Sequence, residues 1–96
     1  RFSKEIQPKV SFILEKWKEY VPGNSEIILS KSGKTVARVC SYSSEYLLIH
    51  RNKQLINHVK NKYKTFDSGH SIRILLKHTS IEEIKEILNK IKMYNS

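Results

Sequence analysis

The sequence predicts an α+β fold: a two-layer sandwich in which helices cover one face of a mostly antiparallel sheet of about four strands. Three segments repeat apolar residues at helical spacing, and four others are short, rich in β-branched residues and bounded by turn residues. Their order along the chain is α-β-β-β-α-β-α. With 96 residues, of which 39% are hydrophobic, the chain suffices for one core and not for two. We therefore expect a single basic domain over residues 1–96, and the start at Arg1 suggests a module of a longer chain.

The first predicted helix begins near Ser3, a candidate N-cap, with Pro8 in its early turns. One face of this helix is apolar, because its hydrophobic residues recur at helical spacing. Pro22-Gly23 is expected to end the helix. The residues of the apolar face are Val10, Ile13, Leu14, Trp17 and Val21.

The predicted strands cover residues 25–31, 34–40, 45–50 and 71–77. Ser32-Gly33 separates the first two and suits a hairpin, because glycine accepts the positive φ that such a turn needs. Alternation along each strand sends one set of apolar side chains toward the helices. That set is Ile27, Leu29, Ala37, Val39, Leu47, Ile49, Ile72, Ile74 and Leu76.

Two further helices are expected after the third and fourth strands. Asn52 can cap the second helix, and residues 64–70 after it form a polar loop with Asp-Ser-Gly turn chemistry. Ser80 and Glu83 have the spacing of a capping box and open the third helix. The apolar faces comprise Leu55, Ile56, Val59 and Tyr63 in the second helix, and Ile81, Ile84, Ile87, Leu88 and Ile91 in the third.

A winged-helix domain, with residues 34–50 as the wing, is the second candidate architecture. Such a domain normally places three helices before its wing. Here three predicted strands precede the second helix, so the sandwich is favoured.

The formal net charge of +9 is unevenly distributed. Residues 27–81 hold ten lysine and arginine residues but only two acids, Glu45 and Asp67, so this middle segment carries +8 of the total. Residues 1–26 and 82–96 have nearly balanced charge. A localised basic surface is what a protein that binds polyanions requires.

The first candidate surface is the sheet face that turns away from the helices. Cations neutralise phosphates, while rings and guanidinium planes stack on bases, so a basic and aromatic sheet face suits nucleic acid. The alternatives are an ordinary solvated face and a face covered by another segment of the parent chain. The alternation assigns to this face Lys31, Arg38, Tyr46, Arg73 and Lys77, with Val36, Leu48, His50 and Leu75 among them.

The second candidate surface is the second helix and the turn after it. Helical spacing puts Lys53, Lys60 and Lys64 on roughly one side, and no acid lies near them in sequence. A surface that is charged only for solubility normally mixes positive and negative residues, so this pattern favours a binding surface. The alternative is an ordinary solvated helix. The cations of this surface are Arg51, Lys53, Lys60, Lys62 and Lys64, with Tyr63 and Phe66 interleaved; Tyr46, Tyr63 and Phe66 are the candidate stacking groups.

The residue types that carry catalysis or metal binding are sparse. The single cysteine, Cys40, forms no internal disulfide and no thiolate zinc site. Cys40 is better explained as a buried apolar residue, and the Asp67–His70 pair as part of a turn. The histidines lack the spacing of a zinc motif; they are His50, His58, His70 and His78. We therefore expect no catalytic residue, no cofactor and no metal site.

The sequence also bears on compartment. The longest apolar run, residues 46–49, is far shorter than the roughly 20 residues that span a bilayer. The first residues show no secretory signal pattern. With a single cysteine, these features predict an intracellular protein, cytoplasmic or associated with a nucleoid or nucleus, and no membrane partner.

Three functional hypotheses follow from this sequence. The leading one is a non-enzymatic domain that binds DNA or RNA, as an accessory part of a replication, transcription or ribonucleoprotein assembly. The alternative is a protein-interaction module that docks an acidic partner protein. The third is a small metal-independent nuclease.

Overall fold

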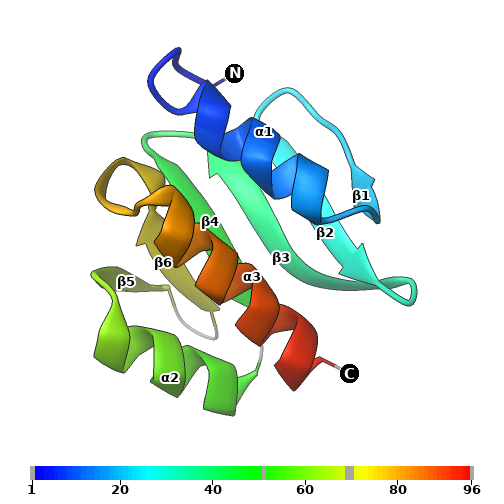
Figure 1. Cartoon of the computed structure of the whole chain (residues 1–96), viewed down its shortest axis with the longest axis vertical. Coiled ribbons are helices and arrows are strands. Elements are labelled where there is room, and N and C mark those ends of the chain that lie inside the picture. Colours follow the sequence, from blue (N-terminus) through cyan, green and yellow to red (C-terminus); the bar gives the residue numbers. More distant parts are fainter. Residues whose placement is uncertain (1, 51, 69–70, 96) are drawn as a thin grey trace.

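Six antiparallel strands form one sheet in the computed structural model of the chain, and three helices cover one of its faces (Figure 1). From edge to edge the strands follow the order β1-β2-β3-β4-β6-β5. The structure describes residues 2–50, 52–68 and 71–95, and the side chains of residues 67 and 68 lie outside this description. The strand bounds are β1 Tyr20–Val21, β2 Glu26–Lys31, β3 Lys34–Ser41, β4 Glu45–His50, β5 Thr65–Ser68 and β6 Ser71–Leu75.

The helices α1 (Gln7–Lys16), α2 (Lys53–Lys62) and α3 (Ile81–Tyr94) form the second layer, with α3 between the other two (Figure 1). Their apolar stripes meet the inward-facing strand residues in one core. No described helix lies on the opposite side of the sheet, and we refer to that side as the open face. The buried stripe of α3 comprises Ile84, Ile87, Leu88 and Ile91.

The predicted α+β class and the inward strand residues are confirmed. All nine side chains that alternation directs toward the helices are at most 6% exposed. A residue on a strand alternates between faces regardless of its partners, so this pattern is encoded locally. The observed bounds of β2, β3 and β4 differ from the predicted ones by no more than one residue.

The sheet has six strands rather than about four, because neither edge strand was predicted from the sequence. β1 occupies the end of the first predicted helix: α1 stops at Lys16, and Trp17 already has extended backbone angles. β5 occupies the first half of the predicted loop at 64–70. The helix also begins later than expected, with Ile6 at its N-cap, while Ser3 donates hydrogen bonds to Glu45.

Trp17 joins the helical layer to the sheet. Its indole Nε1 donates a hydrogen bond to the carbonyl of Ser30 in β2 at 2.8 Å, and its side chain is 3% exposed. The ammonium of Lys92 on α3 lies 5.7 Å from the ring centroid. Val21, which the helical pattern placed beside Trp17 on one face, lies in β1 and is 57% exposed. Trp17, the residue directly after α1, is therefore part of the core.

The connection between β2 and β3 is a two-residue hairpin turn, as predicted. Ser32 and Gly33 have φ values of 54° and 80°, the positive values typical of a type I′ turn. The carboxylate of Glu19 accepts hydrogen bonds from both of their amides, at 3.1 and 2.9 Å. Glu19 thereby fixes the turn.

The starts of α2 and α3 are also as predicted. The side chain of Asn52 accepts a hydrogen bond from the amide of Leu55 at 3.1 Å. Ser80 and Glu83 form both bonds of the capping box. These side chains satisfy amides that an α-helix leaves without an internal partner.

Candidate nucleic-acid interface

One row of paired residues crosses the open face from edge to edge. Paired residues on adjacent antiparallel strands share a face, so the register fixes which side chains stand next to each other. Two arginines in this row alternate with apolar or aromatic side chains. The row, which we name the central row, consists of Val21, Ile28, Arg38, Leu48, Arg73 and Phe66, one from each strand.

The central row is partly accessible. Val21 and Phe66 at its ends are 57% and 49% exposed, and the four residues between them are half-buried. Arg38 and Arg73 flank Leu48, so their backbones are about 10 Å apart, twice the usual distance between adjacent strands. The open face therefore presents two cations that are spaced by an apolar side chain.

Arg73 rests on the ring of Tyr46. Its guanidinium carbon lies 4.7 Å from the ring centroid, within the range of a cation–π contact. Tyr46 is only 5% exposed, and burial is the main cause of a raised pKa for its hydroxyl. Tyr46, a candidate stacking group in the sequence, thus supports Arg73 from below instead of presenting its own ring to solvent.

Arg38 is paired with an acid on the neighbouring strand. Its guanidinium donates to the carboxylate of Glu26, and the hydroxyl of Tyr42 donates to the second oxygen of the same carboxylate. The hydrogen bond from Tyr42, followed by the contacts with Arg38, holds the pKa of Glu26 below its ordinary value. Glu26 is therefore ionised at neutral pH and offsets the charge of Arg38.

Replacing Glu26 with glutamine should remove a small contribution to stability that depends on pH. Because the folded pKa of Glu26 lies below an unfolded value of about 4.3, the contribution is complete above that value and is lost as pH falls through the folded pKa. A partly exposed pair of this kind contributes at most about 1 kcal/mol. Urea unfolding of both proteins at neutral and at strongly acidic pH measures the difference, which should shrink on acidification; a larger difference in acid contradicts the assignment.

Phe66 reaches the open face through β5. The sequence placed Phe66 in a turn beside the second helix, because Asp-Ser-Gly follows it directly. In the structure Phe66 pairs with Arg73, and its ring is the exposed aromatic group of the central row. Thr65 and Phe66 are strand-favouring residues, and this was the signal available in the sequence.

Two of the candidate residues around α2 are engaged by α3. The ammonium of Lys62 lies 3.3 Å from a carboxylate oxygen of Glu86, and the hydroxyl of Tyr63 donates to the same oxygen. The hydrogen bond from Tyr63, and then the contact with Lys62, lowers the pKa of Glu86. Burial and this bond raise the pKa of Tyr63, whose ring is half-buried. Glu86 thus compensates part of the positive charge at this end of α2.

The other cations of the second candidate surface remain at the surface. Lys53, Lys60 and Lys64 are exposed. Arg51 lies outside the described residues. Lys64 stands two residues before Phe66 at the start of β5, so the two candidate surfaces come together at this edge of the sheet.

Two lysines do not lie where the sequence placed them. Lys31 has the same parity as Ile27 and Leu29, so it points to the helical side, where its ammonium donates to the carbonyl of Lys92. Lys77 follows the end of β6 and lies in a short 3₁₀ helix, η1 (Leu76–His78). Neither belongs to the open face.

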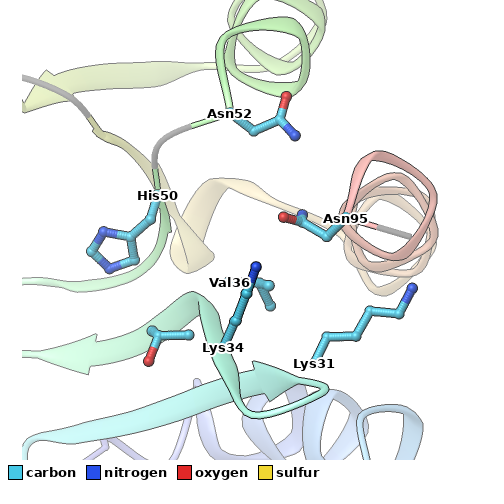
Figure 2. A pocket seen from close by; sticks show the side chains of 7 residues that line it. Lys31, Lys34, Val36, His50, Asn52 and Asn95 are labelled. Carbon is cyan, nitrogen blue, oxygen red and sulfur yellow. The ribbon is translucent and has the colours of Figure 1, made fainter.

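A pocket of about 160 Å³ lies at one end of the sheet, between the β2–β3 hairpin, the start of α2 and the end of α3 (Figure 2). Lys34 and Asn95 stand on opposite sides of it, and the ring of His50 is turned away from them (Figure 2). The amides of Asn52 and Asn95 already donate to the carbonyls of Tyr94 and Ile91. Of these two bonds, the first joins the start of α2 to α3 and the second closes the end of α3.

Most of the acidic side chains accept hydrogen bonds from other groups of the protein. Five of the nine acids accept hydrogen bonds from the turn, cap, tyrosine, arginine or serine groups named above. Within the described part of the chain, Lys34, Lys53 and Lys64 have no acid within 4.0 Å. The charges of these three lysines are therefore not compensated by a neighbouring carboxylate of the described residues. The five acids are Glu19, Glu26, Glu45, Glu83 and Glu86.

The described residues contain little that would support chemistry. Cys40 is buried, and burial raises the pKa of its thiol, which disfavours the nucleophilic thiolate. Among the residues that the structure describes, no group of three histidine, cysteine or acidic side chains could hold a metal ion. His70 and the side chain of Asp67 lie outside the description.

The fold and this surface define the protein as an α+β sandwich with one uncovered, arginine-bearing sheet face. Comparisons with protein-family models, with curated proteins and with solved structures find no match to this chain. Over the described ranges, no helix has both the length and the apolar character needed to cross a membrane.

Proposed function

We propose that this protein is a non-enzymatic nucleic-acid-binding domain that contacts phosphates through its basic surfaces. The observation that carries the proposal is the excess of cations over acids, in which Lys34, Lys53 and Lys64 have no acid within 4.0 Å among the described residues. The net charge of +9, most of it in residues 27–81, gives the protein a strongly positive field, and five of its carboxylates are engaged by hydrogen bonds within the protein. Phosphate backbones are the polyanions for which such a field is suited.

Two parts of the surface are favoured as contact sites. The first is the open face, where Arg73 has an aromatic support and, among described residues, no acid within 4.0 Å. The second is the exposed side of α2 with Lys53 and Lys64. Arg38 and Lys62 are weaker candidates, because Glu26 and Glu86 already offset their charges.

The proposal predicts that affinity for DNA and RNA oligonucleotides falls steeply as salt rises. The slope of the logarithm of the binding constant against that of salt concentration should be about 0.7–0.9 for each phosphate contacted. A fluorescence-anisotropy titration between about 50 and 200 mM salt measures this slope. The pair Lys53→Glu and Lys64→Glu should reduce the slope by roughly 1.5 and lower affinity at least about tenfold.

The matched control makes the same change in net charge at another part of the surface. Lys4 and Lys18 are exposed and belong to the N-terminal region of nearly balanced charge, so Lys4→Glu with Lys18→Glu should weaken binding much less. If both double variants lose affinity equally, net charge alone governs binding and no local site exists. If the unchanged protein fails to bind at about 50 mM salt, where electrostatic attraction is strong, the proposal is wrong.

A protein-interaction module is the second candidate, favoured by the apolar content of the open face. Leu48 and Leu75 are half-buried there, whereas Val36, which the alternation also assigned to this face, is 5% exposed and packs in the core next to a register shift between β2 and β3. An acidic partner protein would meet the arginines while covering these apolar side chains. Binding that persists at high salt, with no general affinity for nucleic acid, distinguishes this function from the first.

A further inference from the structure

The central row has a composition that suits bases as well as phosphates. Apolar side chains alternate with guanidinium groups, and the ring of Phe66 completes the row at β5. Bases that lie flat on a protein are held by aromatic rings and by guanidinium planes, whereas phosphates need only charge. A surface for phosphates alone would gain nothing from Leu48 between its cations or from an exposed phenylalanine.

Arg73 and Phe66 are neighbours with defined orientations. Their backbones pair directly across β5 and β6, so their side chains stand side by side on the open face. Tyr46 lies beneath the guanidinium of Arg73 at 4.7 Å and restricts its orientation. The guanidinium of Arg73 is half-buried, and its Nε atom is buried without a hydrogen-bond partner, so this group has hydrogen-bonding capacity that the protein does not use.

The broad sheet favours an unpaired strand over a duplex. The grooves of duplex DNA admit a helix or a two-stranded ribbon, and the open face is part of a six-stranded sheet. In a duplex the flat surfaces of the bases are stacked on one another, out of reach of Phe66. In a single strand these surfaces are free to stack on the protein.

We propose that the open face binds single-stranded nucleic acid, with one base stacked on Phe66 and the guanidinium of Arg73 contacting a neighbouring base or phosphate. This inference rests on the proposed function, and it adds the class of ligand and the contribution of its bases. DNA and RNA single strands offer the same planar rings and the same phosphate charge, so the shared chemistry is an unpaired polynucleotide.

The test compares three probes of equal phosphate number: a thymidine strand, the same strand with abasic sites throughout, and a duplex. A uridine strand added in parallel distinguishes RNA from DNA. The thymidine strand should bind roughly 5- to 100-fold more tightly than the abasic strand, the range expected for stacking of one base. The duplex should bind no more tightly than the abasic strand.

The variants separate stacking from charge. Phe66→Ala should remove most of the preference for the base-bearing strand, whereas Tyr20→Ala should retain it. Tyr20 is 38% exposed but pairs with Leu29, so it is an exposed aromatic residue outside the open face. Arg73→Lys keeps the charge and loses the guanidinium plane, so it should leave the salt slope unchanged and lower the base preference.

The two proposals fail in different ways. Equal, salt-sensitive binding of the thymidine and abasic strands overturns the stacking inference and leaves the phosphate-binding function standing. Weak binding of every probe at low salt contradicts both the phosphate-binding function and the stacking inference. Sedimentation of the protein alone at the same concentrations tests a further contrary outcome. If the protein self-associates, Phe66→Arg abolishes this association and no base preference is found, the open face binds a second copy of this chain and the inference is overturned. Thermal melts of Phe66→Ala, with Phe66→Leu as a milder change, verify that the fold is intact.

Discussion

Replacing Trp17 with alanine should lower the free energy of unfolding by about 3–5 kcal/mol, the range for deletion of a large buried aromatic side chain. Trp17 is 3% exposed and contacts both layers, through the carbonyl of Ser30 on one side and Lys92 on the other. The alanine variant leaves a cavity and removes the hydrogen-bond partner of Ser30. Since a domain of this size has a total stability of roughly 5–15 kcal/mol, the variant should be close to unfolding at room temperature.

Trp17→Phe is the matched control. It keeps an aromatic ring in the core and removes the indole donor, so we expect a loss of about 1–2 kcal/mol. Urea unfolding followed by circular dichroism measures both variants. A loss below about 1 kcal/mol for Trp17→Ala would place this side chain outside the core and contradict the packing of α1 onto β2.

The second large effect concerns two adjacent leucines of β4. Leu47→Ala should lower the free energy of unfolding by about 2–5 kcal/mol, because Leu47 faces the helices and is fully buried. Leu48→Ala should lower it by about 1 kcal/mol, since Leu48 lies half-buried on the open face. The two variants lose the same atoms from neighbouring positions. The difference between their free energies of unfolding therefore shows which of the two side chains faces the core.

Urea unfolding of the two leucine variants also tests the basis of the functional proposals. A strand shifted by one residue exchanges its two faces completely. If Leu48→Ala proves the more destabilising change, the face that carries Arg38 and Arg73 is the buried one, and no ligand can reach it. Equal effects would indicate that a further element covers the open face.

The parts of the fold that were predictable are those that depend on local pattern. The alternation in 45–50 and 71–75 assigned the core side of the sheet correctly, and Asn52 and Ser80 marked two helix starts. β1 and β5 were missed although each pairs with the next strand in the chain: β1 directly follows a helical pattern, and β5 contains the turn-like residues Asp67 and Ser68. Val21 also happened to fit the helical spacing of the preceding residues.

The candidate site was predictable only in part. The sequence assigned Arg38 and Arg73 to the same face of the sheet, and the register of β3, β4 and β6 places them there on either side of Leu48. The pairing of Lys62 with Glu86 joins residues far apart in the chain, so the charge run at the end of α2 looked less compensated than it is. Phe66 lies on the open face because it is part of β5, whereas the residues that follow it, Asp67 and Ser68, favoured a turn in the sequence.

The two edge strands described above are the shortest of the sheet, with two residues in β1 and four in β5. An edge strand exposes amides and carbonyls that can pair with another chain, and long apolar edges promote amyloid-like growth. Here each edge offers few such groups. Arg38 and Arg73 likewise interrupt the apolar side chains of the open face, so two copies brought face to face would oppose like charges. The protein can thus keep half of its sheet uncovered at low risk of aggregation.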